Sequence, residues 1–255
     1  MNVPEFALLV LAGIGAGLIG SIAGLASMIS YPALLAIGIP PITANVTNTV
    51  ALVLNGVGAV SASRPELKGQ GRRLLRLAGA AGLGGATGAA LLLSTPSSAF
   101  ERIVPWLIAG AAIALLLSRP PQALAVEGAA HHPDHKDPWW LPIGTFTICI
   151  YGGYFGAAAG VMLLAMFLLT TGEGLPRCNA LRNVILGIAN GVAAIGFIIF
   201  ASIAWSAALP LAIGLFAGGR LGPRIVRRAP QTLLRRLIGM AGIGLAVVLG
   251  VQAYF

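Results

Sequence analysis

The residue best suited to binding an anion is Arg182, which lies in an otherwise apolar segment together with Asn179 and Asn183. A guanidinium presents a planar set of N–H donors that fits the oxygens of a sulfonate, sulfate or carboxylate. Arg182 lies near the start of this segment, so the alternative is that its head group snorkels to the surface. The first half of the chain repeats the arrangement without the charge, with Thr47 in place of Arg182 and Asn48 in place of Asn183.

The asparagines follow a helical spacing in both halves. Asn48 and Asn55 are seven residues apart and therefore share a helix face, and Asn183 and Asn190 repeat this spacing. Such a stripe inside a membrane is costly unless it faces partners or water, so it indicates either hydrogen bonds between helices or a polar pathway. The pathway is favoured for Asn48 and Asn183, which lie beside glycine-rich segments. For Asn55 and Asn190 both interpretations stay open.

Glycines supply the other half of a candidate anion site. The segments around Gly24 and Gly160 are rich in glycine, which lets a backbone approach a ligand closely. Where helices break, the N-termini of the half-helices present free N–H groups and the positive end of a dipole. The predicted site therefore combines side-chain donors with backbone donors near the breaks; its members are Thr47, Asn48, Arg182, Asn183, Asn179, Ser27, Gly24 and Gly160.

The elements that would hold these residues are membrane helices. Hydrophobic residues make up 57% of the 255-residue chain and charged residues only 9%, against roughly 25% charged in soluble domains. Charge-free stretches such as Phe6–Ile29 and Trp139–Leu169 exceed the roughly 18 apolar residues that mark a spanning helix. The composition predicts an all-α, multi-pass protein of the cell membrane and leaves no soluble catalytic domain.

A repeat organises these helices. The segment Gly17–Gly24 matches Gly153–Gly160 at an offset of 136 residues, and the asparagine stripe follows at an offset of 135. The chain is therefore divided into a first transmembrane repeat at 1–118, a linker at 119–138 and a second transmembrane repeat at 139–255. Transporters built from such repeats hold their substrate where the repeats meet.

Two arginine-rich clusters predict the orientation of the repeats. The clusters Arg64–Arg76 and Arg220–Arg236 hold 11 of the 16 basic residues and fall at non-equivalent positions of the two repeats. Because basic loops face the cytoplasm, equivalent loops then lie on opposite sides of the membrane. The prediction is two inverted repeats of about five transmembrane segments each, both beginning with broken, short helices. The linker and Arg177 face the cytoplasm, and both termini face out.

Other chemistries find little support in the sequence. The linker carries His131, His132 and His135 near Asp134, but prolines flank it and no helix is predicted there to fix metal ligands, so no metal or cofactor is expected. Histidines and paired carboxylates do not occur in the predicted spans, so no enzyme is expected. The basic clusters suit the anionic lipids of a bilayer, and without an aromatic platform no nucleic-acid partner is expected.

These segments resemble the sulfite exporter TauE/SafE family of membrane transporters. The resemblance rests on Gly17–Gly24, Tyr31–Leu34, Gly38–Asn48, Tyr151–Gly160 and Asn179–Asn183, in this order. It implies a small sulfur-containing anion as substrate: sulfite, sulfate, thiosulfate or an organosulfonate. The chain departs from the family at Ala23–Ser27, where members often carry consecutive glycines, so the resemblance leaves the pocket size and the anion undetermined.

The sequence thus predicts a secondary transporter of inorganic or organic sulfur anions, working by alternating access between the repeats. An anion channel, or a membrane accessory subunit of a larger assembly, is the alternative, because inverted repeats also occur in channels. Proton and sodium coupling both stay open. Proton coupling requires a titratable residue at membrane depth, whereas sodium held by backbone carbonyls leaves no side-chain signature. The direction of transport and the oligomeric state are not specified.

Overall fold

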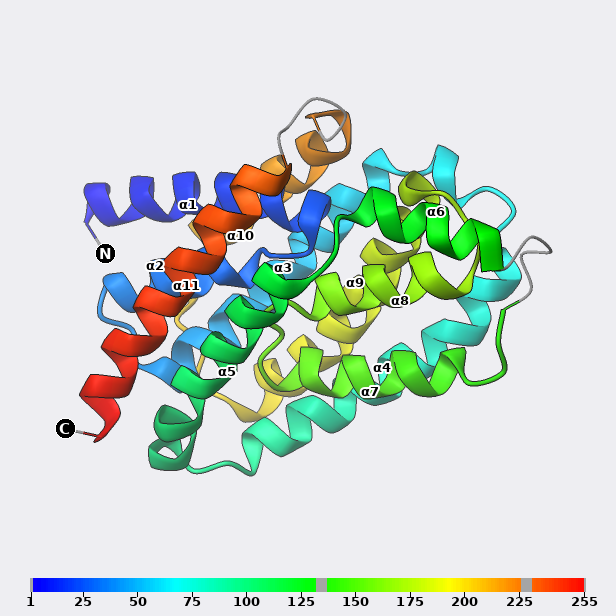
Figure 1. Cartoon of the computed structure of the whole chain (residues 1–255). Coiled ribbons are helices and arrows are strands. Elements are labelled where there is room, and N and C mark those ends of the chain that lie inside the picture. The colour runs from blue at the N-terminus through cyan, green and yellow to red at the C-terminus, as the bar shows by residue number, and fades with distance from the viewer. Residues whose placement is uncertain (1, 132–136, 226–230, 255) are drawn as a thin grey trace.

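A computed structural model describes residues 2–131, 137–225 and 231–254, without the side chains of Ala23 and residues 223–238. Throughout these ranges the secondary structure is helical, with no strand (Figure 1). The first half contains α1 (Val3–Ala23), α2 (Ser27–Ala36), α3 (Pro41–Ala62), the short 3-10 helix η1 (Pro65–Leu67), α4 (Gly71–Leu93) and α5 (Ser97–Leu117). The linker contains α6 (Pro121–His131), and the second half contains α7 (Leu141–Tyr154), α8 (Ala159–Thr170), α9 (Leu175–Phe200), α10 (Trp205–Ile225) and α11 (Gln231–Tyr254).

The helices have the length and apolar surface of a membrane protein. Among the described residues, α1, α4, α5 and α9 are long and apolar enough to cross a bilayer, and α2, α8 and Gly239–Tyr254 are shorter apolar helices. Large apolar side chains cover the outside of the molecule; Leu11, Trp106 and Phe200 are 68%, 70% and 74% exposed. The predicted multi-pass, all-α membrane protein is confirmed. The number of crossings stays a prediction.

Both predicted helix breaks are present. α1 ends at Gly24, whose φ of 78° is left-handed and whose N–H donates to the carbonyl of Gly20 at 2.8 Å. α7 ends before Gly156, also left-handed at φ 77°, and α8 begins directly after left-handed Ala158. At 1.5 Å per residue α2 and α8 are only about 15 and 18 Å long, too short for a hydrocarbon core of about 30 Å.

The prediction of a short first helix was wrong for α1, which runs for 21 residues. A capping box starts it, in which Asn2 and Glu5 exchange hydrogen bonds of 3.0 Å. Its internal glycines do not break it, because Gly13 and Gly17 lie directly against α10, where a side chain would collide with the backbone of Leu211 or Leu215. Packing thus stabilises a helix that glycine content alone would weaken.

The two halves of the chain exchange packing partners. α1 packs on α10 through glycines, and α7 packs on α4 through Cys149, Gly153, Gly84 and Gly88. Residue numbers rise together along both pairs, so both are parallel. In the predicted repeat, α1 would correspond to α7 and α10 to α4. Each half therefore places its first helix against the fourth helix of the other half, through the small residues that let helices approach closely.

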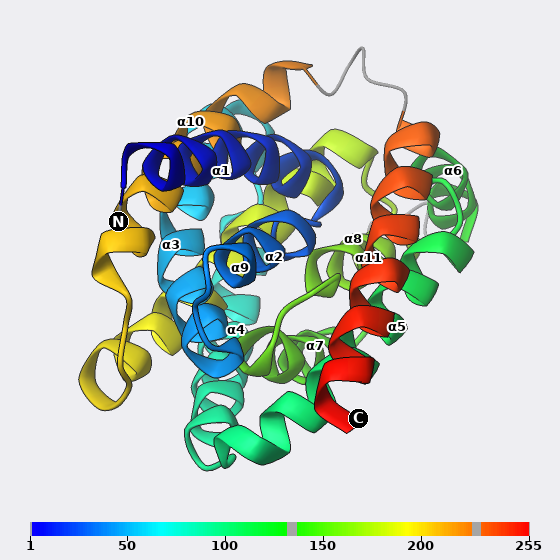
Figure 2. The ribbon, with the colours of Figure 1, turned by 90° about the vertical axis from the view of Figure 1, so that its left-hand side faces the viewer.

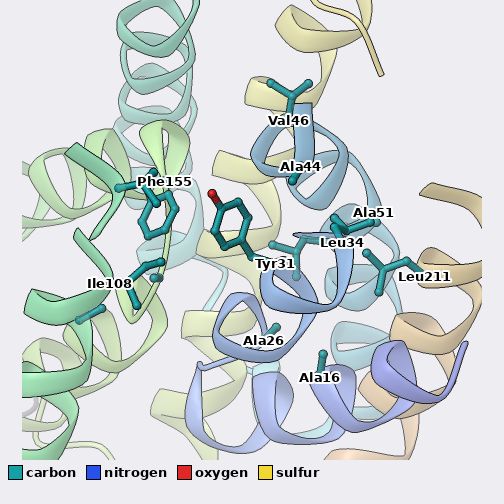
Figure 3. Packing of buried hydrophobic residues seen from close by; sticks show 14 of the residues in the cluster. Ala16, Ala26, Tyr31, Leu34, Ala44, Val46, Ala51, Ile108, Phe155 and Leu211 are labelled. Carbon is teal, nitrogen blue, oxygen red and sulfur yellow. The ribbon is translucent and has the colours of Figure 1, made fainter. Parts of the chain in front are cut away.

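The centre of the molecule is formed by helices of both halves. α3 packs on α9, with α10 on the outer side of α3, α4 on the outer side of α9, and α5 against α11. Figure 2 shows α2 and α9 near the centre, with other helices around them. Figure 3 shows the ring of Tyr31 from α2 between Leu34 and Phe155; the Tyr31 and Phe155 ring centroids are 5.4 Å apart and edge-on. The inverted orientation of the repeats in a membrane stays a prediction.

The linker differs from the prediction, because its first part forms the helix α6. Proline opens this helix at Pro121, where a missing N–H is harmless, and alanines continue it. α6 packs on α8. At this contact Gly128 lies so close to the carbonyl of Leu168 that a side chain would not fit. His131 meets only the carbonyl of Glu127 at 2.8 Å, whereas His132, Asp134 and His135 lie outside the described residues. Over the described residues no group of three potential metal ligands occurs.

An ion-pair network joins three distant segments at one end of the molecule. Arg73 of α4 binds Asp137 at 2.7 Å and Glu173 at 3.1 Å, and Arg177 of α9 binds Glu173 at 2.7 Å. The first basic cluster, the end of the linker and Arg177 therefore share one face. From the second cluster the backbone of Arg220 lies beside α3; Arg224, Arg227, Arg228, Arg235 and Arg236 lie outside the described side chains.

Candidate functional site

The two helix breaks touch each other in the interior. A Cβ atom added to Gly24 would lie 2.5 Å from the carbonyl carbon of Gly160, and one added to Gly160 would lie 2.6 Å from the Cα of Gly24. Only glycine fits at either position. Because α2 begins at Ser27 and α8 at Ala159, this contact brings two helix N-termini, with the positive ends of their dipoles, into one region.

Arg182 of α9 is fully buried beside this contact. Its Nη2 atom donates to the carbonyls of Gly20 and Ser21 at 3.1 and 2.8 Å, and to Oδ1 of Asn183 at 2.6 Å. These carbonyls belong to the last turn of α1, which carries the negative end of the helix dipole, and the carbonyl of Gly20 also accepts from the N–H of Gly24. Arg182 thus caps α1, and the alternative that it snorkels to the surface is wrong for this structure.

The remaining donors around Arg182 have no acceptor within the described part of the protein. Nη1 and Nε of Arg182 and Nδ2 of Asn183 are buried without a hydrogen-bond partner. Nη1 lies beside Gly24, where an added Cβ would be 2.7 Å from it. A buried donor without an acceptor is costly, by about 1–3 kcal/mol and by more when it is charged. The arrangement therefore favours a ligand that carries negative oxygens.

Asparagines tie each half to the helix break of the other half. Asn179 of α9 donates to the carbonyl of Ser21 at 2.9 Å, next to the bonds from Arg182. In the opposite sense, Asn45 of α3 donates to the carbonyl of Tyr154, the last residue of α7, at 2.8 Å. These bonds hold the ends of α1 and α7 in place. Asn179 is a member of the predicted site, whereas Asn45, which lies close to the stripe of Asn48 and Asn55 in the sequence, was not included in it.

Asn48 orients the start of α2. Its Nδ2 donates to the hydroxyl of Ser27 at 3.3 Å, and its Oδ1 accepts from the hydroxyl of Ser30 at 2.5 Å. The Ser30 hydroxyl also reaches the carbonyl of Ala26 at 2.9 Å. Both ends of the Asn48 amide are thus engaged with the first turn of the half-helix. Asn48 and Ser27, predicted separately from the sequence, form one cluster here.

A small cavity lies between the breaks and the central helices. Its volume of about 30 Å³ leaves room for only one or two water molecules. Three predicted site residues line it, namely Gly24, Ser27 and Asn183. Asn55 and Asn190, the outer members of the asparagine stripes, line it as well. Their seven-residue spacing from Asn48 and Asn183 is the sequence signal that could have identified them as lining residues. Other lining residues include Gly20, Ala26, Leu52, Phe155, Gly156 and Leu186.

The other predicted residues do not line the cavity. Arg182 lies directly behind the wall formed by Gly20, Gly24 and Asn183, and Asn179 and Gly160 lie next to it. Thr47 is not brought to the cavity: its hydroxyl accepts from the backbone N–H of Ala204 at 3.1 Å, which ties α3 to the segment before α10. A role for Thr47 in anion binding stays a prediction.

The site contains no acid among the described residues. Arg182 is the one charged residue in the buried polar set, which otherwise consists of serine, threonine, asparagine and glutamine. Glu173, the acid closest to either break in the sequence, is held at the molecular end by Arg73 and Arg177. Burial would raise the pKa of Glu173, but hydrogen bonds from Arg177 and Arg73 outweigh this and lower the pKa below its ordinary value.

Comparison with known proteins gives one family and several relatives. The sequence model of the family described as sulfite exporter TauE/SafE matches residues 9–249. The chain is 29% identical to the probable membrane transporter protein ORF9 of Sinorhizobium sp over 94% of this chain and 90% of that protein. It is 25% identical to the probable membrane transporter protein YfcA of Escherichia coli K12, over 88% and 81%. It is 28% identical to a probable membrane transporter protein of Haemophilus influenzae, over 93% and 91%. No solved structure matches the chain.

Proposed function

The chain belongs to the sulfite exporter TauE/SafE family, and from this premise we propose that it is a secondary transporter of small sulfur-containing anions that works by alternating access. That it is a membrane transporter follows from the family and from relatives named for transport and not for catalysis. The substrates in question are sulfite, sulfate, thiosulfate and organosulfonates.

The observation that carries the proposal is Arg182, which is buried beside the contact of the two helix breaks and whose Nη1 and Nε atoms have no hydrogen-bond partner among the described residues. A cation and two helix N-termini converge there with no acid among the described neighbours. This combination suits an oxyanion, because charge-assisted hydrogen bonds and N-terminal N–H groups both stabilise negative oxygens. The anion would bind between the breaks and the cavity wall formed by Gly24 and Asn183.

Alternating access is supported by the way in which the halves share this site. Arg182 and Asn179 of the second half hold the end of α1, and Asn45 of the first half holds the end of α7. A shift of α4, α7 and α9 relative to α1, α3 and α10 would therefore move the donors and the backbone of the site apart. The cavity of about 30 Å³ is too small for a hydrated anion, so the transport cycle would open this region to each side in turn.

Reconstitution tests the proposal. Purified protein in liposomes should take up sulfite against its gradient when a proton or sodium gradient is imposed, and an ionophore that removes the driving gradient should abolish accumulation. This pair of gradients also identifies the coupling ion. Uptake that only equilibrates sulfite, whichever gradient is applied, would indicate a channel. No sulfite, sulfate, thiosulfate or sulfonate flux above empty liposomes would contradict the proposed substrate class.

A further inference from the structure

We propose that the Arg182 site accepts singly charged sulfur oxyanions, such as sulfonates and hydrogensulfite, in preference to doubly charged sulfate and thiosulfate. The inference rests on the proposed function, because it concerns the same anion site. What it adds is the charge of the substrate.

The formal charge of the site is a single positive unit. The described groups that contact Arg182 or line the adjacent cavity are backbone carbonyls and neutral side chains, and Arg182 is the one ionised member of the buried polar set. The guanidiniums of Arg73 and Arg177 are occupied at the end of the molecule by Asp137 and Glu173. A second cation is therefore not available to an anion at this site among the described residues.

The helix ends do not supply a second positive charge. A helix terminus carries a partial charge of about half a unit, positive at the N-terminus and negative at the C-terminus. α2 and α8 begin at the breaks, but α1 and α7 end there as well. The negative partial charges of α1 and α7 reduce the positive contribution of α2 and α8 to less than a full unit charge, and Nη2 of Arg182 is already bonded to the C-terminal carbonyls of α1.

Burial makes this charge balance decisive. A singly charged anion next to Arg182 forms a neutral pair, whereas a doubly charged anion leaves one negative charge without compensation in a medium of low dielectric. The cost of removing an ion from water grows with the square of its charge, so the doubly charged anion also loses more hydration. The cavity holds only one or two waters, which cannot replace that hydration.

Apolar side chains in the lining of the cavity favour an anion with an apolar substituent. Leu52, Phe155 and Leu186 line it, together with Ala26. An organosulfonate would direct its oxygens toward Nη1 and Nε of Arg182 and Nδ2 of Asn183, and its carbon substituent toward this apolar surface. Sulfate would place a charged oxygen there instead, against side chains that offer no hydrogen bond.

Two anions of similar size and different charge test the inference. The affinities of methanesulfonate and sulfate for the protein in lipid nanodiscs are measured by titration calorimetry at neutral pH. We expect methanesulfonate to bind at least about tenfold more tightly. Equal or tighter binding of sulfate that is lost in Arg182→Gln would overturn the charge inference alone. Binding of neither anion would contradict the proposed function together with it.

An isosteric variant gives the second test. Asn183→Asp keeps the acceptor that Nη2 of Arg182 already contacts at 2.6 Å, but it neutralises the site. We expect the affinity for methanesulfonate to fall at least about tenfold while the melting temperature stays at or above that of the parent protein. Unchanged methanesulfonate affinity in Asn183→Asp would overturn the inference. Arg119→Gln, which breaks an exposed pair with Glu127 far from the site in sequence, serves as control.

Discussion

Arg182 uses different parts of its guanidinium for different tasks. Nη2 holds three oxygens, those of Gly20, Ser21 and Asn183, while Nη1 and Nε have no acceptor among the described residues. Of the planar set of donors expected from the sequence, Nη2 thus binds the end of α1, whereas Nη1 and Nε are left for the proposed ligand. Lysine offers no such division, because its donors share one nitrogen.

Replacing Arg182 by glutamine should weaken anion binding by about 10- to 150-fold, since a charge-assisted hydrogen bond is worth about 1.5–3 kcal/mol. Arg182→Lys should recover only part of this loss. Both variants should also melt at lower temperature, because they weaken the cap of α1. Titration of sulfite into nanodisc-embedded protein gives the affinity, and Arg119→Gln is the reference. Native affinity in Arg182→Gln would leave the backbone N–H groups as the main anion ligands.

At the scale of elements, the site depends on two half-helices that meet at their starting points. Neither α2 nor α8 is long enough to cross the hydrocarbon core, and both begin at the Gly24–Gly160 contact. The contact brings backbone to backbone, with no side chain between. A larger residue in place of either glycine would separate α1 from α8 and would move the carbonyls that accept hydrogen bonds from Arg182.

Gly160→Ala should therefore reduce transport strongly without removing the protein from the membrane, because its Cβ would lie 2.6 Å from the Cα of Gly24. Gly24→Ala should act in the same way and should also strain the backbone, which is left-handed at φ 78°. Gly15→Ala in α1 and Gly191→Ala in α9 are matched controls, since an added Cβ meets nothing within 4 Å at either position. Sulfite uptake by equal amounts of each variant in liposomes measures the effect. Full activity of Gly160→Ala would contradict a site at the contact.

At the scale of the whole molecule, the two halves are interlocked. α1 lies on α10 and α10 on α3, while α7 lies on α4 and α4 on α9. Each of these packed groups contains helices from both halves of the chain. We expect such groups, held by close glycine contacts, to move as rigid units during transport, with the change in shape concentrated at the breaks.

The inverted topology predicts which loops share a side. In a protein without Cys149 and Cys178, a cysteine at Lys68 should react with a membrane-impermeant reagent only from the cytoplasm, and a cysteine at Ser202 only from outside. Both positions are exposed in the structure. Labelling of intact cells and of inverted vesicles measures the sides. Reaction of both cysteines from the same side would contradict inverted repeats.

The ion-pair network predicts a loss of stability in acid. The pKa of Glu173 is lowered in the folded protein, so its contribution to stability is present above the ordinary glutamate range and is lost as the pH falls through the lowered value. The melting temperature should therefore decrease as the pH is lowered below about 4. Glu173→Gln should melt lower at neutral pH and show a smaller fall in acid. Glu127→Gln, at the exposed pair with Arg119, should behave as the parent; an identical acid profile for Glu173→Gln would contradict the role of this network.

Several features follow from the sequence because they depend on local composition and spacing. The apolar runs predicted a multi-pass helical membrane protein, and the glycines at 24 and 156 coincide with left-handed residues at the breaks. The seven-residue spacing of Asn183 and Asn190 predicted a shared helix face, and both residues line the cavity. Local rules failed at the linker helix α6 and at the length of α1. Both elements are stabilised by close packing on distant helices, α8 and α10, which a local pattern does not contain.

The tertiary structure decided what Arg182 does. An arginine near the start of an apolar helix could equally reach the surface, and only the approach of α1 from the other half places the carbonyls of Gly20 and Ser21 against it. Tertiary packing also distinguishes Thr47 from Arg182, the residue that it matches in the second half of the sequence. The Thr47 hydroxyl accepts from the N–H of Ala204, so equivalent sequence positions face different surroundings. Composition and period are properties of one helix, whereas the partner of a buried polar group depends on which helix lies beside it.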